Sequence, residues 1–426
     1  MSASTQRLNY SQVPPRASSS RAIRNEITPT NGSSFNANSQ IIIDLPANLN
    51  NTFCDFQSSY IKATVSNSDG SAANFCGGGF PSMIKQIVLE LGGQTLFSCD
   101  SWNVLYEMML SLDSSAQFRD NAGKRLFGAG GNFDGQEIAA GGSVKVCFPL
   151  VLTPLMANRY FPLIGRDRLR IRLILDTGVR GLVSANDLTD AQITVSDVAL
   201  VTYNLELGSD VMAMVAANSG GAFKIAMPSY QSQQTTMATG DTTKNIVLGF
   251  SMSSLNRILV AQQKATITGA MTLGARNRNH ITRFFVTIGG VKYPMRDVQD
   301  LGSATAVGGE GCEPFAEALI SQRALCAWSH DSSIEVDGTF ALENGGGTNS
   351  ATTGSFLIDL DLESQRVAGG EGSLGLVAGV NTIGQVVSIT LEYSGDHADA
   401  QVVNVYGEHT ILCSLDLNTL TWSIAV

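Results

Sequence analysis

From residue 40 onward, apolar and polar residues alternate in short runs separated by turns, with the period of two that is typical of half-buried β-strands. In the clearest run, residues 168–175, apolar residues share one face and arginines the other: Leu169, Ile171, Leu173 and Leu175 against Arg168, Arg170 and Arg172. Three like charges along one face repel each other. We therefore expect carboxylates of neighbouring strands or of a neighbouring subunit beside these arginines, with solvent or nucleic acid as alternatives.

A strand pattern interrupted by two glycines occurs twice. Residues 83–97 (MIKQIVLELGGQTLF) contain Gly92-Gly93, and residues 282–293 (TRFFVTIGGVKY) contain Gly289-Gly290. Each glycine pair predicts a two-residue hairpin or a tight corner between two sheets. The recurrence of this pattern indicates two similar lobes.

Further landmarks repeat in the same order and at nearly the same spacing. The tripeptide Asp-Ala-Gln occurs at 190–192 and at 399–401, and the segments LILDTG and TLEYSG place Gly178 against Gly395. In both halves the predicted order is strand, turn, strand, helix and further strands. This order indicates one plan shared by the two lobes.

A helix is predicted in each half. After a candidate N-cap at Asp100 or Ser101, apolar residues recur at helical spacing: Trp102, Leu105, Tyr106, Met108, Met109 and Leu112. We expect this face to pack on a sheet and not to form a cofactor site. In the second half, residues 313–327 (EPFAEALISQRALCA) predict a helix with Pro314 in its first turn.

Composition agrees with a β-rich protein. Of the 426 residues, 43 are glycine and only 15% are charged. These values favour an all-β protein whose outside is largely covered by copies of itself, although a large single-chain β protein would look similar. The net charge of −10 argues against a general nucleic-acid-binding surface on the folded body, so any such contact must be local.

The chain divides into an arm and two lobes, at residues 1–38, 39–208 and 209–426. The arm is polar, and its basic residues are opposed only by Glu26: Arg7, Arg16, Arg21 and Arg24. Because so little apolar surface cannot offset the entropy of ordering, we expect the arm to be flexible until something binds it. It is then either a plain disordered terminus or a segment that orders on an assembled neighbour or contacts anionic phosphate.

The cysteines show no spacing that indicates a disulfide framework or a zinc site. They are seven, scattered and without a C-x-x-C pair: Cys54, Cys76, Cys99, Cys147, Cys312, Cys326 and Cys413. We expect reduced, mostly buried thiols in an intracellular product, with one disulfide or a zinc site as alternatives. The N-terminus lacks an apolar signal core and no run of 18 apolar residues exists, which predicts neither secretion by the usual route nor a membrane span.

No motif predicts catalysis, a cofactor or a metal. The glycine pattern at 370–375 matches a dinucleotide-binding loop by letter only, since no strand leads into it and no helix follows. The four histidines are isolated from one another: His280, His330, His397 and His409. Three acidic residues share one face of the strand predicted at 356–363, which we expect to be solvated, with a Ca²⁺ site as the alternative: Asp359, Asp361 and Glu363.

Taken together, these segments resemble the double jelly-roll major capsid proteins of tailless icosahedral DNA viruses. Residues 79–110, around Gly92-Gly93, look like the first barrel of polinton-like virus and virophage capsid proteins. The segments SMSSLNRILVAQQ, TRFFVTIGGVKYP, AEALIS, FLIDLDLES and SGDHADAQVVNVYGEH look like the second barrel, in order. The resemblance covers nearly the whole chain after residue 38. It implies an all-β protein of two tandem eight-stranded jelly-roll barrels, with a short helix in each.

The resemblance also implies a function and partners. The expected protein is a major capsid protein without catalytic residues, which forms pseudo-hexameric homotrimers that tile an icosahedral shell, as in adenovirus hexon. Further expected partners are minor capsid or penton proteins. The arm, with its four arginines, would lie near nucleic acid or an inner membrane. The protein would be made inside the host cell and reside in the virion.

Two other functions are consistent with a β-rich chain. A receptor- or carbohydrate-binding β-sandwich, such as a fibre or lectin-like domain, would expose an aromatic platform. Trp102, Trp328 and Trp422 instead lie in helical or strand patterns that suggest burial. A jelly-roll enzyme would need a constellation of histidines or carboxylates, which the sequence does not show.

Overall fold

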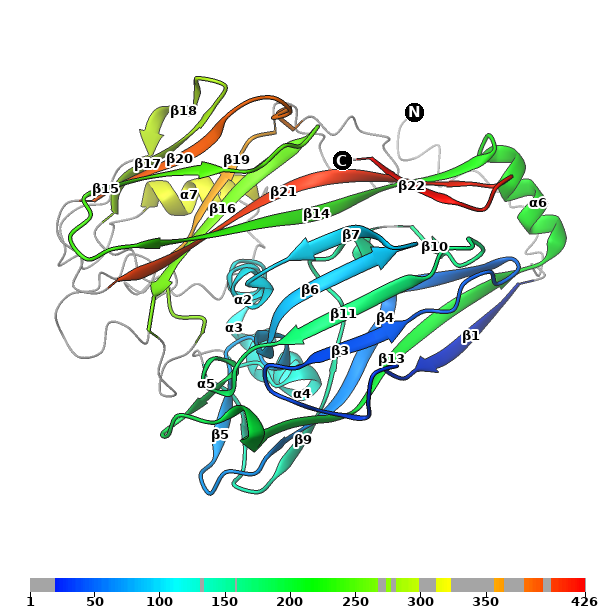
Figure 1. The fold of residues 1–426 in the computed structure, drawn as a ribbon, viewed down its shortest axis with the longest axis horizontal. Coiled ribbons are helices and arrows are strands. Elements are labelled where there is room, and N and C mark those ends of the chain that lie inside the picture. The colour runs from blue at the N-terminus through cyan, green and yellow to red at the C-terminus, as the bar shows by residue number, and fades with distance from the viewer. Residues whose placement is uncertain are drawn as a thin grey trace, which may run out of the picture.

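The computed structural model describes residues 20–130, 134–157, 159–266, 273–276, 281–298, 312–322, 356–363, 379–393 and 400–425. Strands dominate this part of the chain and form two lobes that lie side by side (Figure 1). Within the described part of the chain, no helix is both long and apolar enough to cross a membrane.

The first lobe contains two main antiparallel sheets. One has the order β1-β13-β4-β10, with β2 also paired to β13 and β9 to β4, and the other has the order β3-β11-β6-β7. A small sheet, β12-β5-β8, lies at one end. The strands are β1 (Ser20–Ile27), β2 (Ser34–Asn36), β3 (Gln40–Asp44), β4 (Thr52–Asn67), β5 (Ala73–Cys76), β6 (Ile84–Leu91), β7 (Gln94–Cys99), β8 (Asp134–Ile138), β9 (Ser143–Phe148), β10 (Phe161–Pro162), β11 (Leu169–Leu175), β12 (Leu182–Ser184) and β13 (Ile193–Leu207).

The second lobe repeats this arrangement. Its sheets have the orders β14-β21-β16-β19, with β22 also paired to β21, and β15-β20-β17-β18. The strands are β14 (Ala222–Met237), β15 (Thr243–Leu248), β16 (Leu255–Lys264), β17 (Ile281–Ile288), β18 (Val291–Val298), β19 (Ile358–Asp361), β20 (Val387–Tyr393), β21 (Gln401–Asp416) and β22 (Trp422–Ala425).

The two lobes have the same topology. In chain order, β1, β3, β4, β6, β7, β9, β11 and β13 occupy the same sheet positions as β14, β15, β16, β17, β18, β19, β20 and β21. In each set, the eight strands form two four-stranded antiparallel sheets. Every connection crosses from one sheet to the other except the hairpins β6–β7 and β17–β18. This is the jelly-roll topology. The prediction of two tandem eight-stranded jelly rolls is confirmed.

Both glycine pairs form hairpins. In the first, Gly92 and Gly93 have φ of 59° and 82°, and Leu91 pairs with Gln94. In the second, Gly289 and Gly290 have φ of 56° and 86°, and the strands on either side pair directly. Positive φ at both central residues defines the two-residue turn that matches strand twist, and glycine adopts it without steric cost. The alternative of a corner between sheets is therefore not what the chain forms.

The longest helices of the described part are α2 (Trp102–Asp113), α6 (Ser209–Asn218) and α7 (Cys312–Ser321). The first was predicted, and α7 coincides with the start of the helix predicted at 313–327, whose last residues lie outside the described part. Sequence reasoning missed α6, which joins the lobes at the far end from β15 (Figure 1). Shorter turns are α3 (Ala116–Phe118), η2 (Arg119–Gly123), α4 (Lys124–Phe127), α5 (Gly178–Gly181), η1 (Phe80–Met83), η3 (Pro154–Met156) and η4 (Asp190–Gln192).

The predicted arm is shorter in the structure. Residues 20–38 belong to the first lobe, because β1 and β2 both pair with β13. Ser20 pairs with Leu207 and Ile27 with Leu200, so the whole of β1 is held by the backbone ladder. The composition of residues 1–38 did not indicate this pairing, because an edge strand gains much of its stability from a partner far away in sequence. Residues 1–19 lie outside the described part.

Candidate functional site

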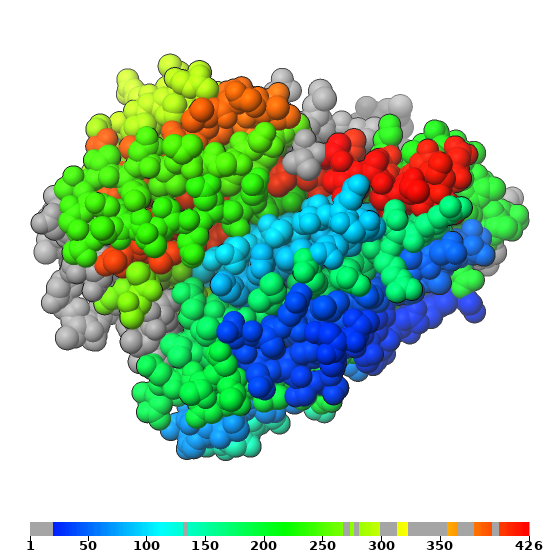
Figure 2. Space-filling model, viewed as in Figure 1, coloured from blue at the N-terminus to red at the C-terminus, as the bar shows by residue number. Residues whose placement is uncertain are grey.

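The two lobes meet along a seam (Figure 2), and α2 of the first lobe lies against the second lobe in it (Figure 1). Ten of the twelve α2 residues are buried. The hydroxyl of Tyr406 donates a hydrogen bond to the carbonyl of Ser101 at 2.8 Å, and the Asp100 amide donates to Ser232 Oγ at 2.8 Å. The helix was expected to pack one face on a sheet. It is instead covered on nearly all sides, because a lobe lies on either side of it.

A buried carboxylate fixes α2 to the loop before β6. Glu107 Oε1 accepts hydrogen bonds from the Gly78 amide at 2.6 Å and from the Ser82 hydroxyl. Its Oε2 lies 4.0 Å from Arg119 Nη2, and neither side chain is more than 3% exposed. A buried charge is tolerated only when it is paired and hydrogen-bonded. The geometry is that of a structural clamp within the first lobe.

A buried arginine of the second lobe reaches α2. Arg276 donates from Nη2 to Ser111 Oγ at 3.0 Å, and from Nη1 and Nε to the carbonyls of Gly274 at 3.1 Å and Phe356 at 3.3 Å. Burial lowers its pKa to about 10, so the guanidinium stays charged at neutral pH. This side chain therefore ties the second lobe to the end of α2.

Arg257 on β16 is the centre of a second charged cluster at the seam. Its Nε lies 2.5 Å from Glu408 Oε2 and its Nη1 lies 3.4 Å from Asp359 Oδ2. Its Nη2 contacts Tyr230 Oη at 3.4 Å and Met109 Sδ on α2 at 3.6 Å. All three nitrogens of the guanidinium thus have partners, and one of these partners, Met109, belongs to the first lobe.

The expectation of a solvated acidic face at Asp359 is wrong. This carboxylate is fully buried, and α7 covers it: Ser321 Oγ donates to it at 2.7 Å and Gln322 Nε2 at 3.2 Å. Burial raises its pKa to about 6, with Arg257 acting in the opposite direction. Asp361 and Glu363 are partly exposed. In the described part of the chain, no three residues of the metal-ligating types lie close enough to hold a metal ion.

The described cysteines offer no reactive thiolate. Cys54, Cys76, Cys99, Cys147 and Cys413 form no disulfide within the described part of the chain, and all but Cys147 are buried. Burial raises the pKa of Cys54 and of Cys413 to about 12, so these thiols stay protonated at neutral pH. These five positions agree with the prediction of reduced, mostly buried cysteines. The side chain of Cys312 and the whole of Cys326 lie outside the described part of the chain.

His409 is the one histidine within the described residues. It is 6% exposed on β21, and its Nδ1 has no hydrogen-bond partner within the described part of the chain. Burial lowers its pKa, so the folded protein resists protonation of this ring more than the unfolded chain does. The other three histidines lie outside the described residues.

We expect His409 to make the protein less stable as the pH falls below the ordinary histidine pKa of 6.5. Below that pH the unfolded chain binds the proton more readily, which favours unfolding. Asp359 acts in the opposite sense between its ordinary pKa and about 6. Urea unfolding of the wild type and of His409→Gln between pH 8 and 5 isolates the histidine. Equal pH dependence in the two proteins would contradict the expectation.

At the other end of the seam, aromatic residues join the lobes. Phe161 and Trp422 stack with ring centroids 5.0 Å apart and planes 11° apart. Phe53 and Phe223 lie 5.8 Å apart, also one from each lobe. The Trp422 amide donates to Asp167 Oδ2 at 3.2 Å. The predicted burial of tryptophans therefore holds fully for Trp102 and partly for Trp422, whereas Trp328 lies outside the described residues.

The arginines of β11 have carboxylate partners within the chain, as predicted. Arg170 donates two hydrogen bonds to Asp44 on β3, at 2.7 and 3.2 Å, and Arg172 forms an ion pair with Glu90 on β6. Arg168 is exposed. Each exposed ion pair of this kind contributes about 0.2–1 kcal/mol to the free energy of unfolding. Two of the three predicted arginines thus have carboxylate partners on neighbouring strands of the same sheet.

The arginines of the predicted arm are divided between two situations. Arg21 and Arg24 lie on β1, where they form exposed ion pairs with Glu206 at 2.7 Å and with Glu26 at 2.9 Å. Arg7 and Arg16 lie outside the described residues. A contact of these four residues with a genome or inner shell stays a prediction.

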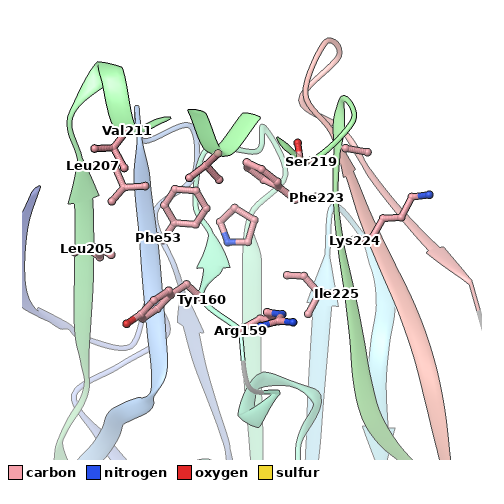
Figure 3. A pocket seen from close by; sticks show the side chains of 13 residues that line it. Phe53, Arg159, Tyr160, Leu205, Leu207, Val211, Ser219, Phe223, Lys224 and Ile225 are labelled. Atoms are coloured by element: carbon pink, nitrogen blue, oxygen red, sulfur yellow. The ribbon is translucent and has the colours of Figure 1, made fainter. Parts of the chain in front are cut away.

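An apolar pocket opens beside α6, where the two lobes are joined (Figure 3). Its volume is about 590 Å³. Apolar side chains of both lobes and of the helix line it, among them Phe53, Leu207, Val211, Val215 and Phe223. No residue of α6 is buried. Sequence reasoning did not identify this concave apolar surface.

Comparisons with known proteins identify the fold. No protein-family model matches the chain, and no curated protein matches it in sequence. A chain of the PBCV-1 virus capsid matches with a TM-score of 0.64 and 11% identity, over 98% of this chain and 99% of that one. The chain has the double jelly-roll fold. The Faustovirus major capsid protein matches at 0.61 and 9% identity (95% and 92% covered), and the mavirus major capsid protein at 0.53 and 10% (95% and 90%).

Proposed function

We propose that this double jelly-roll protein is the structural subunit of a viral capsid and acts by self-assembly. The observation that carries the proposal is the presence of two jelly rolls with identical strand order in one chain. Support comes from the match of nearly the full length of both chains with a capsid chain of PBCV-1. No catalytic residue, cofactor or metal is part of the proposal, and the expected location is the virion.

We propose a homotrimer as the assembling unit. Three chains with a head-to-tail contact close into a ring, and two similar lobes in each chain give that ring six similar units. Such a block can meet like neighbours on six sides and so tile a shell. The boundary between the two domains would lie at residues 208 and 209, as predicted, and the first domain would include β1 and β2 from residue 20 onward. Supporting this division, the described strands before α6 pair only with each other, as do those after it.

One surface suits a subunit contact. Three exposed apolar residues lie near the β17–β18 turn of the second lobe: Val291 is 54% exposed, Ile383 55% and Val386 66%. The Gly289 amide donates to the Val386 carbonyl at 3.0 Å, which places this turn beside the start of β20. Exposed apolar groups that gather in one place favour a protein contact. Minor capsid proteins, and nucleic acid or a membrane near the N-terminus, are further proposed partners.

Light scattering and electron microscopy of the purified protein test the proposal. We expect a particle with three times the 45.1 kDa mass of one chain, and a pseudo-hexagonal outline in negative stain. A receptor- or carbohydrate-binding β-sandwich would instead bind a glycan or cell surface as an isolated unit. A protein that stays monomeric at all concentrations and forms no such particles would contradict the capsid function.

A further inference from the structure

The seam within the chain joins two different surfaces of two similar lobes. From the first lobe, β7 and the residues that follow it lie against β14 of the second lobe (Figure 1). The Asp100 amide donates to Ser232 Oγ at 2.8 Å, and Gln234 Nε2 donates to Ser101 Oγ at 3.4 Å. The first lobe thus contributes the edge strand of the sheet β3-β11-β6-β7, and the second contributes the outer face of the sheet β14-β21-β16-β19.

Each lobe also carries a counterpart of the surface that the other lobe uses in the seam. Because the lobes have the same topology, β18 holds in the second lobe the edge position that β7 holds in the first. In the first lobe, Ser196 of β13 pairs with Ser34 of β2 and Thr64 of β4. Asn404 of β21 pairs in the same way with Gln234 of β14. The outer face at β2, β13, β4 and β9 therefore corresponds to the seam face of the second lobe.

This outer face of the first lobe is lined by small uncharged polar residues. Their side chains are exposed or partly exposed, and they alternate with the buried residues Phe35, Val65 and Val195. Protein interfaces are depleted of charge at their centre, and short side chains let a second surface come close to the backbone. We call it the receiving face, and its residues are Ser34, Asn36, Thr64, Ser66, Ser143, Thr194 and Ser196.

The edge strand β18 presents an exposed apolar residue on a fixed backbone. Residues 294–297 bulge out of the ladder between β18 and β17, and Met295 within the bulge is 91% exposed. The bulge is held at its base by Asp297, whose side chain is 10% exposed and forms ion pairs with Lys292 and Arg283. A segment whose backbone is already fixed loses little conformational freedom when it binds. An apolar group of this kind favours a protein contact.

We infer that β18 of one chain docks on the receiving face of a second copy, in the way that β7 docks on the second lobe within the chain. This inference rests on the proposed self-assembly and names the surfaces that would carry it out. Figure 1 shows β18 and β13 on opposite sides of the molecule, so the two surfaces meet between chains and not within one. Each chain would then use β18 toward one neighbour and the receiving face toward another, which is a head-to-tail contact.

The seam argues against the two other ways in which β18 could meet a second copy. Within the chain, the edge strand β7 meets the face of a sheet and not another edge, so a two-fold contact of β18 with β18 would have no counterpart in the seam. Direct addition of a strand to β18 would need an uninterrupted row of backbone groups. The bulge at residues 294–297 interrupts that row.

Photochemical cross-linking of the full-length protein tests which surfaces meet. Chains with p-benzoylphenylalanine in place of Met295 are mixed, one half isotopically light and the other heavy, so that cross-links between chains are recognised by mass. We expect them to join residue 295 to peptides that contain residues 34–36, 64–66, 143–145 or 194–196. Cross-links only within one chain, only to the second lobe, or to no peptide of the protein would overturn the inference.

Met214 on α6 provides the matched control, because it is an exposed methionine, at 65%, outside both proposed surfaces. The same photoreactive group at position 214 should give no cross-link to the receiving face. In sedimentation experiments, Met295→Glu should weaken association at least about tenfold, since it would bring an uncompensated charge into the contact. Met214→Glu should leave association unchanged. Equal association of the wild type and Met295→Glu would contradict the role of β18.

The receiving face is tested by a separate variant. Ser34→Arg combined with Ser66→Arg places two long charged side chains on this face and should also weaken association at least about tenfold. Since none of the replaced side chains is buried, each variant should fold, which circular dichroism checks. Unchanged association of the double variant would refute the receiving face.

Failure of this inference and failure of the proposed function would look different. A wild-type trimer that both Met295→Glu and the double variant leave intact would refute the assigned surfaces, whereas self-assembly itself would stand. A wild-type protein that is monomeric at every concentration would refute both.

Discussion

Replacing Arg257 with alanine should lower the free energy of unfolding by about 3–5 kcal/mol, as expected when one partner of a buried ion pair is removed. The side chain of Arg257 is only 11% exposed, and it holds Asp359 and Glu408 at the seam. Without it, two carboxylates remain close together in a region of low dielectric. The loss would appear in urea unfolding followed by tryptophan fluorescence.

Arg283 is the matched control for this experiment. It also has two carboxylate partners, Glu392 at 2.6 Å and Asp297 at 3.2 Å, but its side chain is 43% exposed. Because water already screens these pairs, Arg283→Ala should cost only about 0.2–1 kcal/mol. If the two alanine variants lose equal stability, burial is not what makes the Arg257 cluster important.

A second form of the experiment tests the mechanism of the loss. Removing all three charges together, as Arg257→Met, Asp359→Asn and Glu408→Gln, leaves no uncompensated ion at the seam. Replacement of a complete buried ion cluster is often close to neutral. The triple variant should therefore be more stable than Arg257→Ala, and a lower stability would contradict this explanation.

Replacing Gly79 with alanine should cost about 2–5 kcal/mol, the sum of backbone strain and overpacking. Gly79 has φ of 76°, and a Cβ added there would lie 2.3 Å from the Phe127 carbonyl oxygen and 2.8 Å from the Ala129 amide nitrogen. Both obstacles are backbone atoms, which cannot rotate away. The loop before β6 would have to move away from the end of α4.

Two other glycines separate strain from overlap. Gly93 has φ of 82° but open space around it, so Gly93→Ala should show the cost of strain alone, about 1–2 kcal/mol. Gly70 has neither a positive φ nor a neighbour within 4 Å, so Gly70→Ala should change stability by less than about 0.5 kcal/mol. Thermal unfolding of the three variants should follow this order, and a loss at Gly79 no larger than that at Gly93 would exclude the steric term.

Sequence patterns correctly predicted the elements that are determined by residues close together in the chain. Alternation placed β11, because a strand with one buried face must repeat every two residues. The glycine pairs located both turns, since few residues other than glycine accept positive φ twice in succession, but they left open whether each turn was a hairpin or a corner between sheets. The repetition of these signals then gave the two-lobe organisation, and the resemblance to capsid proteins gave the jelly-roll topology.

Features that depend on distant partners were not predictable in this way. Arg257 stands alone in an apolar run, and its partners Asp359 and Glu408 lie 102 and 151 residues further along the chain. The strand β1 is polar and is held by pairing with β13, near the other end of its lobe. The helix α6 is apolar at most of its positions (SDVMAMVAAN), so its sequence shows no contrast between an apolar and a polar face. The pocket beside α6 is lined by residues from three separate parts of the sequence, at 53, 159–162 and 205–225, so no single segment indicates it.

The position of α2 has a consequence for synthesis on the ribosome. The hydrogen bond between Tyr406 and Ser101 spans 305 residues, so the side of α2 that faces the second lobe stays uncovered until the last long strand has emerged. Contacts that close so late make folding slow, and an apolar surface exposed in the meantime favours aggregation. After the first lobe has been translated, the apolar surface of α2 therefore stays exposed until the C-terminal strands of the same chain are synthesised. Chaperones should bind the nascent chain most strongly during that interval.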